Sequence, residues 1–131
     1  MRLLSRLLPL LVLAGCRAPT PPPDPAALDP VAFRYVTLVL ALGTHDANYV
    51  DAYHGPDSIR TLAVAESLSV AQIGASADSL IATLGDNVPR YADSVVALRH
   101  SYLRAQLGAV TARARMLGGE RMSFDQEALA L

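Results

Sequence analysis

One long stretch decides the fold: VPRYADSVVALRHSYLRAQLGAVTARARML, which occupies residues 88–117. Its apolar residues recur at alternating steps of four and three, the spacing of a helix that packs nearly parallel to a neighbour. This first row consists of Tyr91, Val95, Leu98, Tyr102, Ala105, Ala109, Ala112 and Met116. A second row beside it consists of Val96, Leu103, Leu107, Val110, Ala114 and Leu117. Together they predict a helix over 88–117, capped by Asn87 and ended by two glycines, that buries a broad face against more than one helix.

Shorter helices are predicted on the N-terminal side of this stretch. Asp29-Pro30 has the residues of a helix start, and the apolar run that follows to Gly43 predicts a helix at the centre of a bundle. Asp46 is expected to cap a short helix that ends before Gly55, and another short helix is expected over 57–67. Ser69 and the Gln three residues later match a capping box, which predicts a helix from Val70 to Leu84.

The last predicted helix begins at the capping-box pair Ser123 and Gln126, and the chain stops two turns later at Leu131. A helix this short is marginal unless it is packed against something. We therefore expect an all-α fold, a small bundle of four to six helices, in a domain over 30–131 that is truncated at its C-terminus or completed by a partner.

Charge is distributed unevenly along the chain. All eleven basic residues are arginines. Residues 24–89 carry eight acids and two arginines (2 − 8 = −6), whereas residues 90–121 carry six arginines and two acids (6 − 2 = +4). One interpretation is an anionic partner such as phospholipid or polyanionic glycan. The favoured interpretation is that the two halves of one domain pair with each other, and no nucleic-acid partner is expected.

The N-terminus has the layout of a secretory signal over residues 1–15. Arg2 and Arg6 precede the short apolar run 7–13, and small residues follow. The next residue is Cys16, the only cysteine of the chain, so no internal disulfide is expected.

The sequence Leu13-Ala14-Gly15-Cys16 resembles the lipobox of bacterial lipoproteins. The resemblance implies cleavage before Cys16, a diacylglycerol on its thiol and often a further acyl chain such as palmitate, so that the partner is membrane lipid. It implies a location in the bacterial cell envelope, and Arg17 favours the outer membrane facing the periplasm. One alternative is an ordinary cleaved signal that leaves a soluble periplasmic protein. An uncleaved transmembrane helix is the other, for which the apolar run is too short.

Residues 16–29 are expected to form a tether. Four of its prolines lie between positions 21 and 25, and such a segment favours extended polyproline II. We expect it to hold the folded domain away from the lipid surface; a proline-rich ligand for a partner domain is the minor alternative.

The stretch from Thr44 to Pro56 has the most varied side chains of the chain. His45 and His54 are nine residues apart, which does not match the helical spacing of metal-ligand pairs, so no metal and no other cofactor is predicted. The favoured interpretation is a capped connector whose tyrosines pack on the bundle. A further interpretation is a pocket rim, which would consist of His45, Asp46, Tyr49, Tyr53 and His54.

Two stretches, residues 45–56 and 113–127, together resemble the N-terminal helical region of exported bacterial proteins that are similar to all-helical zinc metallopeptidases. In such peptidases a helix carries His-Glu-x-x-His, whose histidines bind zinc while the Glu activates water. This chain has no such motif, so no catalytic residue is carried over. The resemblance predicts a lipid-anchored, N-terminal helical part that is not catalytic by itself. The alternative is a complete small lipoprotein that acts as an interaction or scaffold module.

Overall fold

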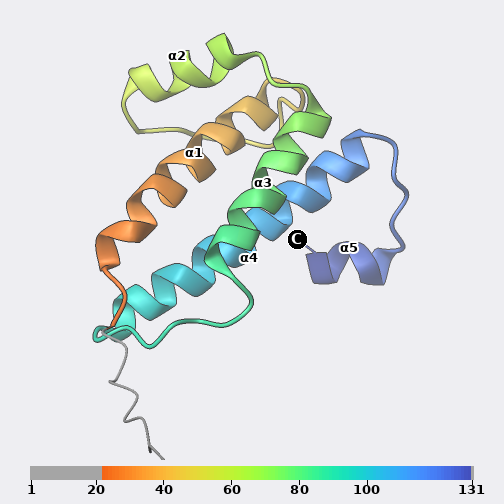
Figure 1. Cartoon of the computed structure of the whole chain (residues 1–131). Helices are drawn as coiled ribbons and strands as arrows, with labels where there is room; N and C mark the ends of the chain where they lie inside the picture. Colours follow the sequence, from red (N-terminus) through yellow and green to blue (C-terminus); the bar gives the residue numbers. More distant parts are fainter. Residues whose placement is uncertain (1–21, 131) are drawn as a thin grey trace, which may run out of the picture.

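The computed structural model describes residues 22–130, a range that is helical and contains no strand. The signal, Cys16 and the first residues of the tether lie outside the described residues. After the 3-10 helix η1 come five α-helices, which confirm the expected all-α bundle (Figure 1); the elements are η1 (Pro25–Leu28), α1 (Asp29–Gly43), α2 (Asp57–Glu66), α3 (Val70–Leu84), α4 (Ser94–Leu117) and α5 (Phe124–Ala130).

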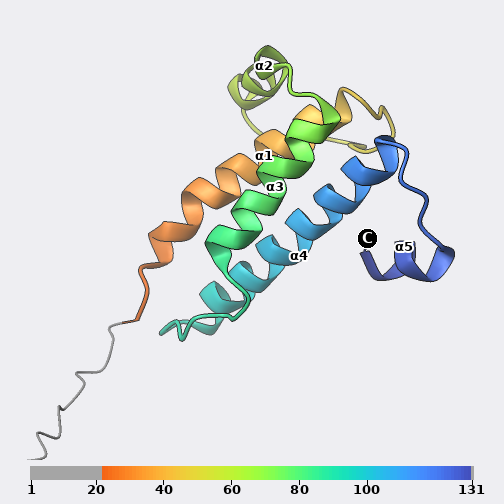
Figure 2. The same ribbon diagram turned by 45° about the vertical axis from the view of Figure 1, so that its right-hand side comes forward.

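Three helices form the body of the bundle. α1, α3 and α4 lie side by side, and α3 runs antiparallel to the other two (Figures 1 and 2). α2 packs near the C-terminal end of α1, and α5 lies outside α4 on a separate connection. η1 and the start of α1 lie at the same end of the bundle as the first turns of α4, where Arg99 binds Asp29 at 2.8 Å.

The core lies where these three helices meet. Leu38, Leu42, Ile73, Leu107 and Val110 are completely buried. α3 and α4 lie close together at Gly74, because a Cβ atom built there would lie 3.4 Å from the Cβ of Ala114. Side chains this small let two helices pack at short range, and the α3–α4 contact is the most extensive between helices of the described chain.

η1 and α1 together, Pro25–Gly43, form the one described segment that is long and apolar enough to cross a membrane, with a mean hydropathy of 1.4. In this structure it is a core helix. Leu38 and Leu42 face the interior, and Arg34 is ion-paired with Glu66 of α2 at 2.6 Å.

The prediction that both apolar rows of α4 are buried in one broad face is confirmed only in part. Most members of the second row are buried, together with His100 and Thr111, whereas Val95, Leu98 and Tyr102 of the first row are 68%, 69% and 56% exposed. The two rows lie on different faces of one helix, and only the face that meets α1 and α3 is covered. We call Val95, Leu98 and Tyr102 the outer patch of α4.

α4 begins at Ser94, six residues later than predicted. Asp93 is its N-cap, and the carboxylate accepts a hydrogen bond from the Val95 N–H at 2.7 Å. Asn87 lies in the preceding loop instead. That loop is held against α4 by Arg104, whose guanidinium donates to the Gly85 carbonyl and to Asp86 at 2.9 and 2.8 Å. The first bond satisfies a loop carbonyl without a helix, and the second is an ion pair with the Asp86 side chain.

The short helix predicted after Asp46 does not form. Residues 46–56 are an irregular connector, in which the Asp46 carboxylate accepts a bond from the Asn48 N–H at 3.2 Å. This side-chain turn competes with helical hydrogen bonds, which is why Asp can end a helical run as well as start one.

Other predicted ends are confirmed. The Ser69–Gln72 capping box is present, as are both bonds of the Ser123–Gln126 pair. Gly85 follows α3 with φ +76°, a conformation that favours glycine.

The predicted start of α1 is wrong. Asp29 is not an N-cap, because η1 leads directly into α1 and Leu28 is already buried. The folded part therefore begins at Pro25, inside the segment assigned to the tether.

Candidate functional site

A hollow lined by several polar side chains lies between α1, the connector that follows it and α4. It is a hollow of about 450 Å³, lined by Tyr35, Val39, Asp46, Asn48, Tyr49, Gln106, Ala109 and Arg113. α1 contributes two of these residues, the connector three and α4 three. α4 therefore brings together residues that lie about 70 positions apart in the sequence.

An ion pair closes one side of the hollow. Arg113 donates from Nε and Nη2 to the same Asp46 oxygen, at 2.9 and 2.5 Å. The Asp46 side chain is only 11% exposed. The Arg113 guanidinium, and secondarily the Asn48 N–H, lower the pKa of Asp46 below its ordinary value of 3.8. The carboxylate is therefore ionised at neutral pH and already occupied.

Two tyrosines, Tyr35 and Tyr49, also line the hollow. The Tyr35 hydroxyl donates to Gln106 Oε1 at 3.2 Å. Burial, more than the neighbouring phenols of Tyr102 and Tyr49, raises the pKa of Tyr35 to about 12. Burial also raises the pKa of Tyr49. Both phenols stay protonated at neutral pH, so neither is activated as a base or nucleophile.

The structure brings only two of the five predicted rim residues to this hollow, Asp46 and Tyr49. His45 points elsewhere, since its Nε2 donates to the Leu68 carbonyl at 2.7 Å. Tyr53 packs under Arg60, with 5.2 Å from the guanidinium carbon to the ring centre. His54 is exposed in the connector.

Tyr35, Gln106 and Arg113 were missed by sequence reasoning. Only for Arg113 did the sequence give an indication, because it belongs to the arginine-rich half that was expected to pair with the acidic half.

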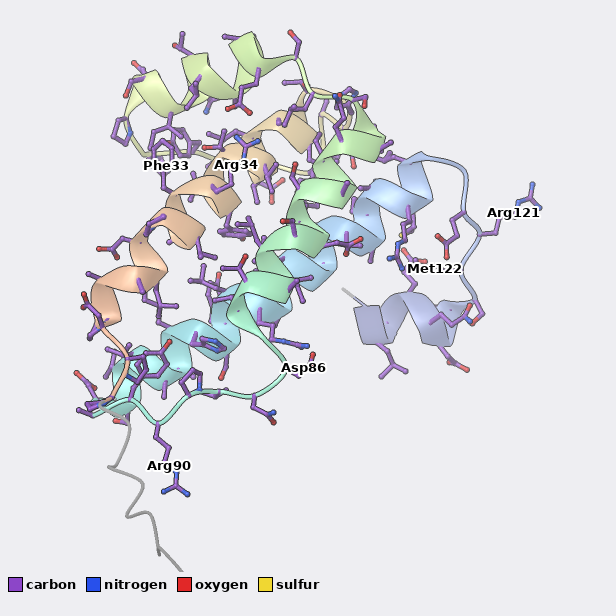
Figure 3. The ribbon with its side chains drawn as sticks, viewed as in Figure 1. Phe33, Arg34, Asp86, Arg90, Arg121 and Met122 are labelled. Atoms are coloured by element: carbon purple, nitrogen blue, oxygen red, sulfur yellow. The ribbon has the colours of Figure 1, made fainter. Side chains whose placement is uncertain are left out.

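That charge pairing is confirmed. Besides Arg99–Asp29, the pairs between the two halves are Arg104–Asp86 at 2.8 Å, Arg113–Asp46 at 2.5 Å and Arg115–Asp78 at 3.6 Å. In the described part of the chain, Arg90 and Arg121 form no such pair, and both point away from the bundle (Figure 3).

The third histidine, His100, has a structural role. It is 1% exposed, and its Nε2 donates to the carbonyl of Leu84 at the end of α3, at 3.0 Å.

Among residues 22–130, no group of three or more His, Cys, Asp or Glu side chains could hold a metal ion. The hollow therefore offers neutral hydrogen-bonding groups and a satisfied ion pair, but neither an activated nucleophile nor a free base.

Comparison of this chain with protein-family models, with curated proteins and with solved structures finds no match.

Proposed function

We propose that this chain is a lipid-anchored protein of the bacterial cell envelope whose helical domain supports another polypeptide and performs no catalysis by itself. The lipobox-like sequence ending at Cys16 supports the anchor. The mutual satisfaction of Asp46 and Arg113, with two protonated phenols beside them, supports a structural role for the hollow.

The main evidence that the domain supports another polypeptide is the exposure of apolar side chains on α5. Its Phe124 and Leu129 side chains are 85% and 90% exposed, although an isolated helix of seven residues is marginal in water. Met122 and Leu129 border an open hollow of about 510 Å³ over α3 and α4, and Met122 lies between α4 and α5 (Figure 3). Apolar side chains left open in this way are typical of a surface that another polypeptide covers.

The polypeptide we favour is the catalytic part of a zinc-peptidase-like protein, for which this domain would be the N-terminal helical part. Sequencing the gene beyond the codon for Leu131 tests this proposal. An open frame that continues to a His-Glu-x-x-His helix is expected. A stop codon directly after Leu131 would contradict it and would favour the alternative, a small interaction or scaffold module whose α5 binds a separate protein.

The anchor has its own test, which uses the full-length chain in a bacterial host. The Cys16→Ser variant is expected to leave the detergent phase and the membrane fraction, because two or more acyl chains are needed for stable anchoring. Arg17→Ser serves as the matched control and should partition like the wild type. If Cys16→Ser stays with the membrane, the anchor proposal is wrong.

A further inference from the structure

The outer patch of α4 lies at the end of the bundle where the described chain begins. Arg99, next to Leu98, binds Asp29 at the first position of α1, so this part of α4 is fixed beside the N-terminal elements. Figures 1 and 2 both show η1 at the same end as the first turns of α4. Arg90, in the loop before α4, points away from the bundle at this end as well (Figure 3).

The chain between this end and Cys16 is short. Nine residue steps separate Cys16 from Pro25, where η1 begins, and nine steps span at most about 30 Å when fully extended. α4 alone, with 24 residues, is about 36 Å long. An anchor at Cys16 therefore holds the end of the bundle that carries the outer patch within about 30 Å of the bilayer, whereas the α2 end can lie farther away. Such tethering gives the patch a high effective concentration of lipid.

The chemistry of the patch fits an uncharged lipid interface. Val95 and Leu98 are apolar, and Tyr102 has the amphipathic ring that is enriched at membrane–water interfaces. The nearby charges nearly balance, because Arg90 and Arg99 stand against Asp24, Asp29 and Asp93. Contact with lipid should therefore depend on burial of apolar surface and not on attraction to anionic headgroups.

We propose that the outer patch of α4 rests on the bilayer that holds the anchor, with Val95, Leu98 and Tyr102 at the level of the lipid headgroups. This inference rests on the proposed anchor. It assigns the two open apolar regions different partners: lipid for the outer patch, and polypeptide for α5. It also replaces the expectation that the tether holds the domain away from the membrane.

The test uses the chain from Cys16 to Leu131, coupled through its only cysteine to phosphatidylcholine vesicles that contain a maleimide lipid. The protein has no tryptophan, so one introduced tryptophan is a unique reporter. Leu98→Trp places it in the patch. Val64→Trp is the matched control, on the exposed face of α2, where Val64 is 57% exposed. Circular dichroism checks that both variants fold, and Tyr102→Trp replaces Leu98→Trp if that variant does not.

Lipids brominated near the headgroup are expected to quench the Leu98→Trp fluorescence by about half or more, as for an interfacial tryptophan, and to leave Val64→Trp nearly unchanged. The quenching should be the same in low and high salt. Equal quenching of both variants, or none for Leu98→Trp, would overturn the proposal. So would a Leu98→Trp emission that is already blue-shifted without vesicles, together with a dimeric mass in sedimentation, because a second copy would then cover the patch.

Failure of this test differs from failure of the anchor. Maleimide coupling does not require acylation in a cell, so an unquenched Leu98→Trp variant leaves the Cys16 anchor standing. Unchanged partitioning of Cys16→Ser in the bacterial host would instead remove the anchor on which this contact depends.

Discussion

The inner and outer faces of α4 carry similar residues at similar spacing but differ in environment. Leu107 and Val110 on the inner face are completely buried, whereas Val95 and Leu98 on the outer face are about two-thirds exposed. The inner face meets α1 and α3, which cover it, whereas no helix of the described chain covers the outer face. An apolar row therefore stabilises the fold only where another helix packs against it, because the free energy of burial is proportional to the apolar area removed from water.

The largest expected effect comes from shortening a side chain on the inner face. Leu107→Ala should lower the free energy of unfolding by about 3 kcal/mol, because it removes buried methyl groups and leaves a cavity. Urea unfolding followed by circular dichroism at 222 nm measures the loss. The same change on the outer face, Leu98→Ala, is the matched control and should cost less than about 0.5 kcal/mol. Similar losses for the two variants would contradict the difference between the faces.

The next effect concerns the polar residue of the inner face. His100→Leu keeps much of the side-chain volume but removes the donor to the Leu84 carbonyl. We expect a loss of about 1–2 kcal/mol, since a buried carbonyl is left without its partner. His54→Leu, in the exposed connector, is the control and should leave the unfolding midpoint unchanged. An unchanged midpoint for His100→Leu would contradict this expectation and would mean that removal of Nδ1, which is buried without a partner among the described residues, offsets the lost bond.

The stability of the fold should depend on pH through Asp46, which is paired with Arg113 of α4. Its pKa is lowered in the folded state, so its ion pair stabilises the protein above the ordinary pKa of 3.8, and this contribution is lost as the pH falls through the lowered value. Asp46→Asn should therefore melt at a lower temperature than the wild type at pH 7, and the difference should shrink at acidic pH.

Thermal melts of both proteins at a series of pH values measure this convergence. Asp51→Asn changes an exposed carboxylate of the same connector and should follow the wild type. A constant gap between Asp46→Asn and the wild type at all pH values would show that charge is not the cause.

The smallest effect at neutral pH is expected at Tyr35. Tyr35→Phe removes one hydrogen bond to Gln106 and should cost about 0.5–1 kcal/mol. Because the folded-state pKa of Tyr35 is raised to about 12, its stabilising effect is complete below pH 10 and is lost as the pH rises from 10 through 12.

An ultraviolet titration of phenolate formation measures this pKa directly. The wild type should show a phenol that titrates near pH 12, which is missing in Tyr35→Phe and still present in Tyr53→Phe, whereas the raised step of Tyr49 remains in both variants. A wild-type curve without a late step would contradict the burial of this hydroxyl.

Local sequence determined much of the helical framework. The bounds of α3 follow from Ser69, Gln72 and Gly85, because capping bonds and a left-handed glycine act within a few residues. The extent of α2 and the C-terminal ends of α1 and α4 were also predictable. So was the pairing of the acidic and arginine-rich halves, since the opposite charges lie on segments that one small domain must bring together.

Only the tertiary structure decided which apolar row of α4 became core. Helical periodicity gives the faces of a helix but not the position of its neighbours, and Val95, Leu98 and Tyr102 of the more regularly spaced row are left exposed. The hollow between α1 and α4 likewise required the fold, because Tyr35, Asp46 and Arg113 meet only after the helices pack. Contacts between residues about 70 positions apart depend on how the helices pack. Rules of spacing and capping apply only to residues close together in the sequence, so they cannot predict such contacts.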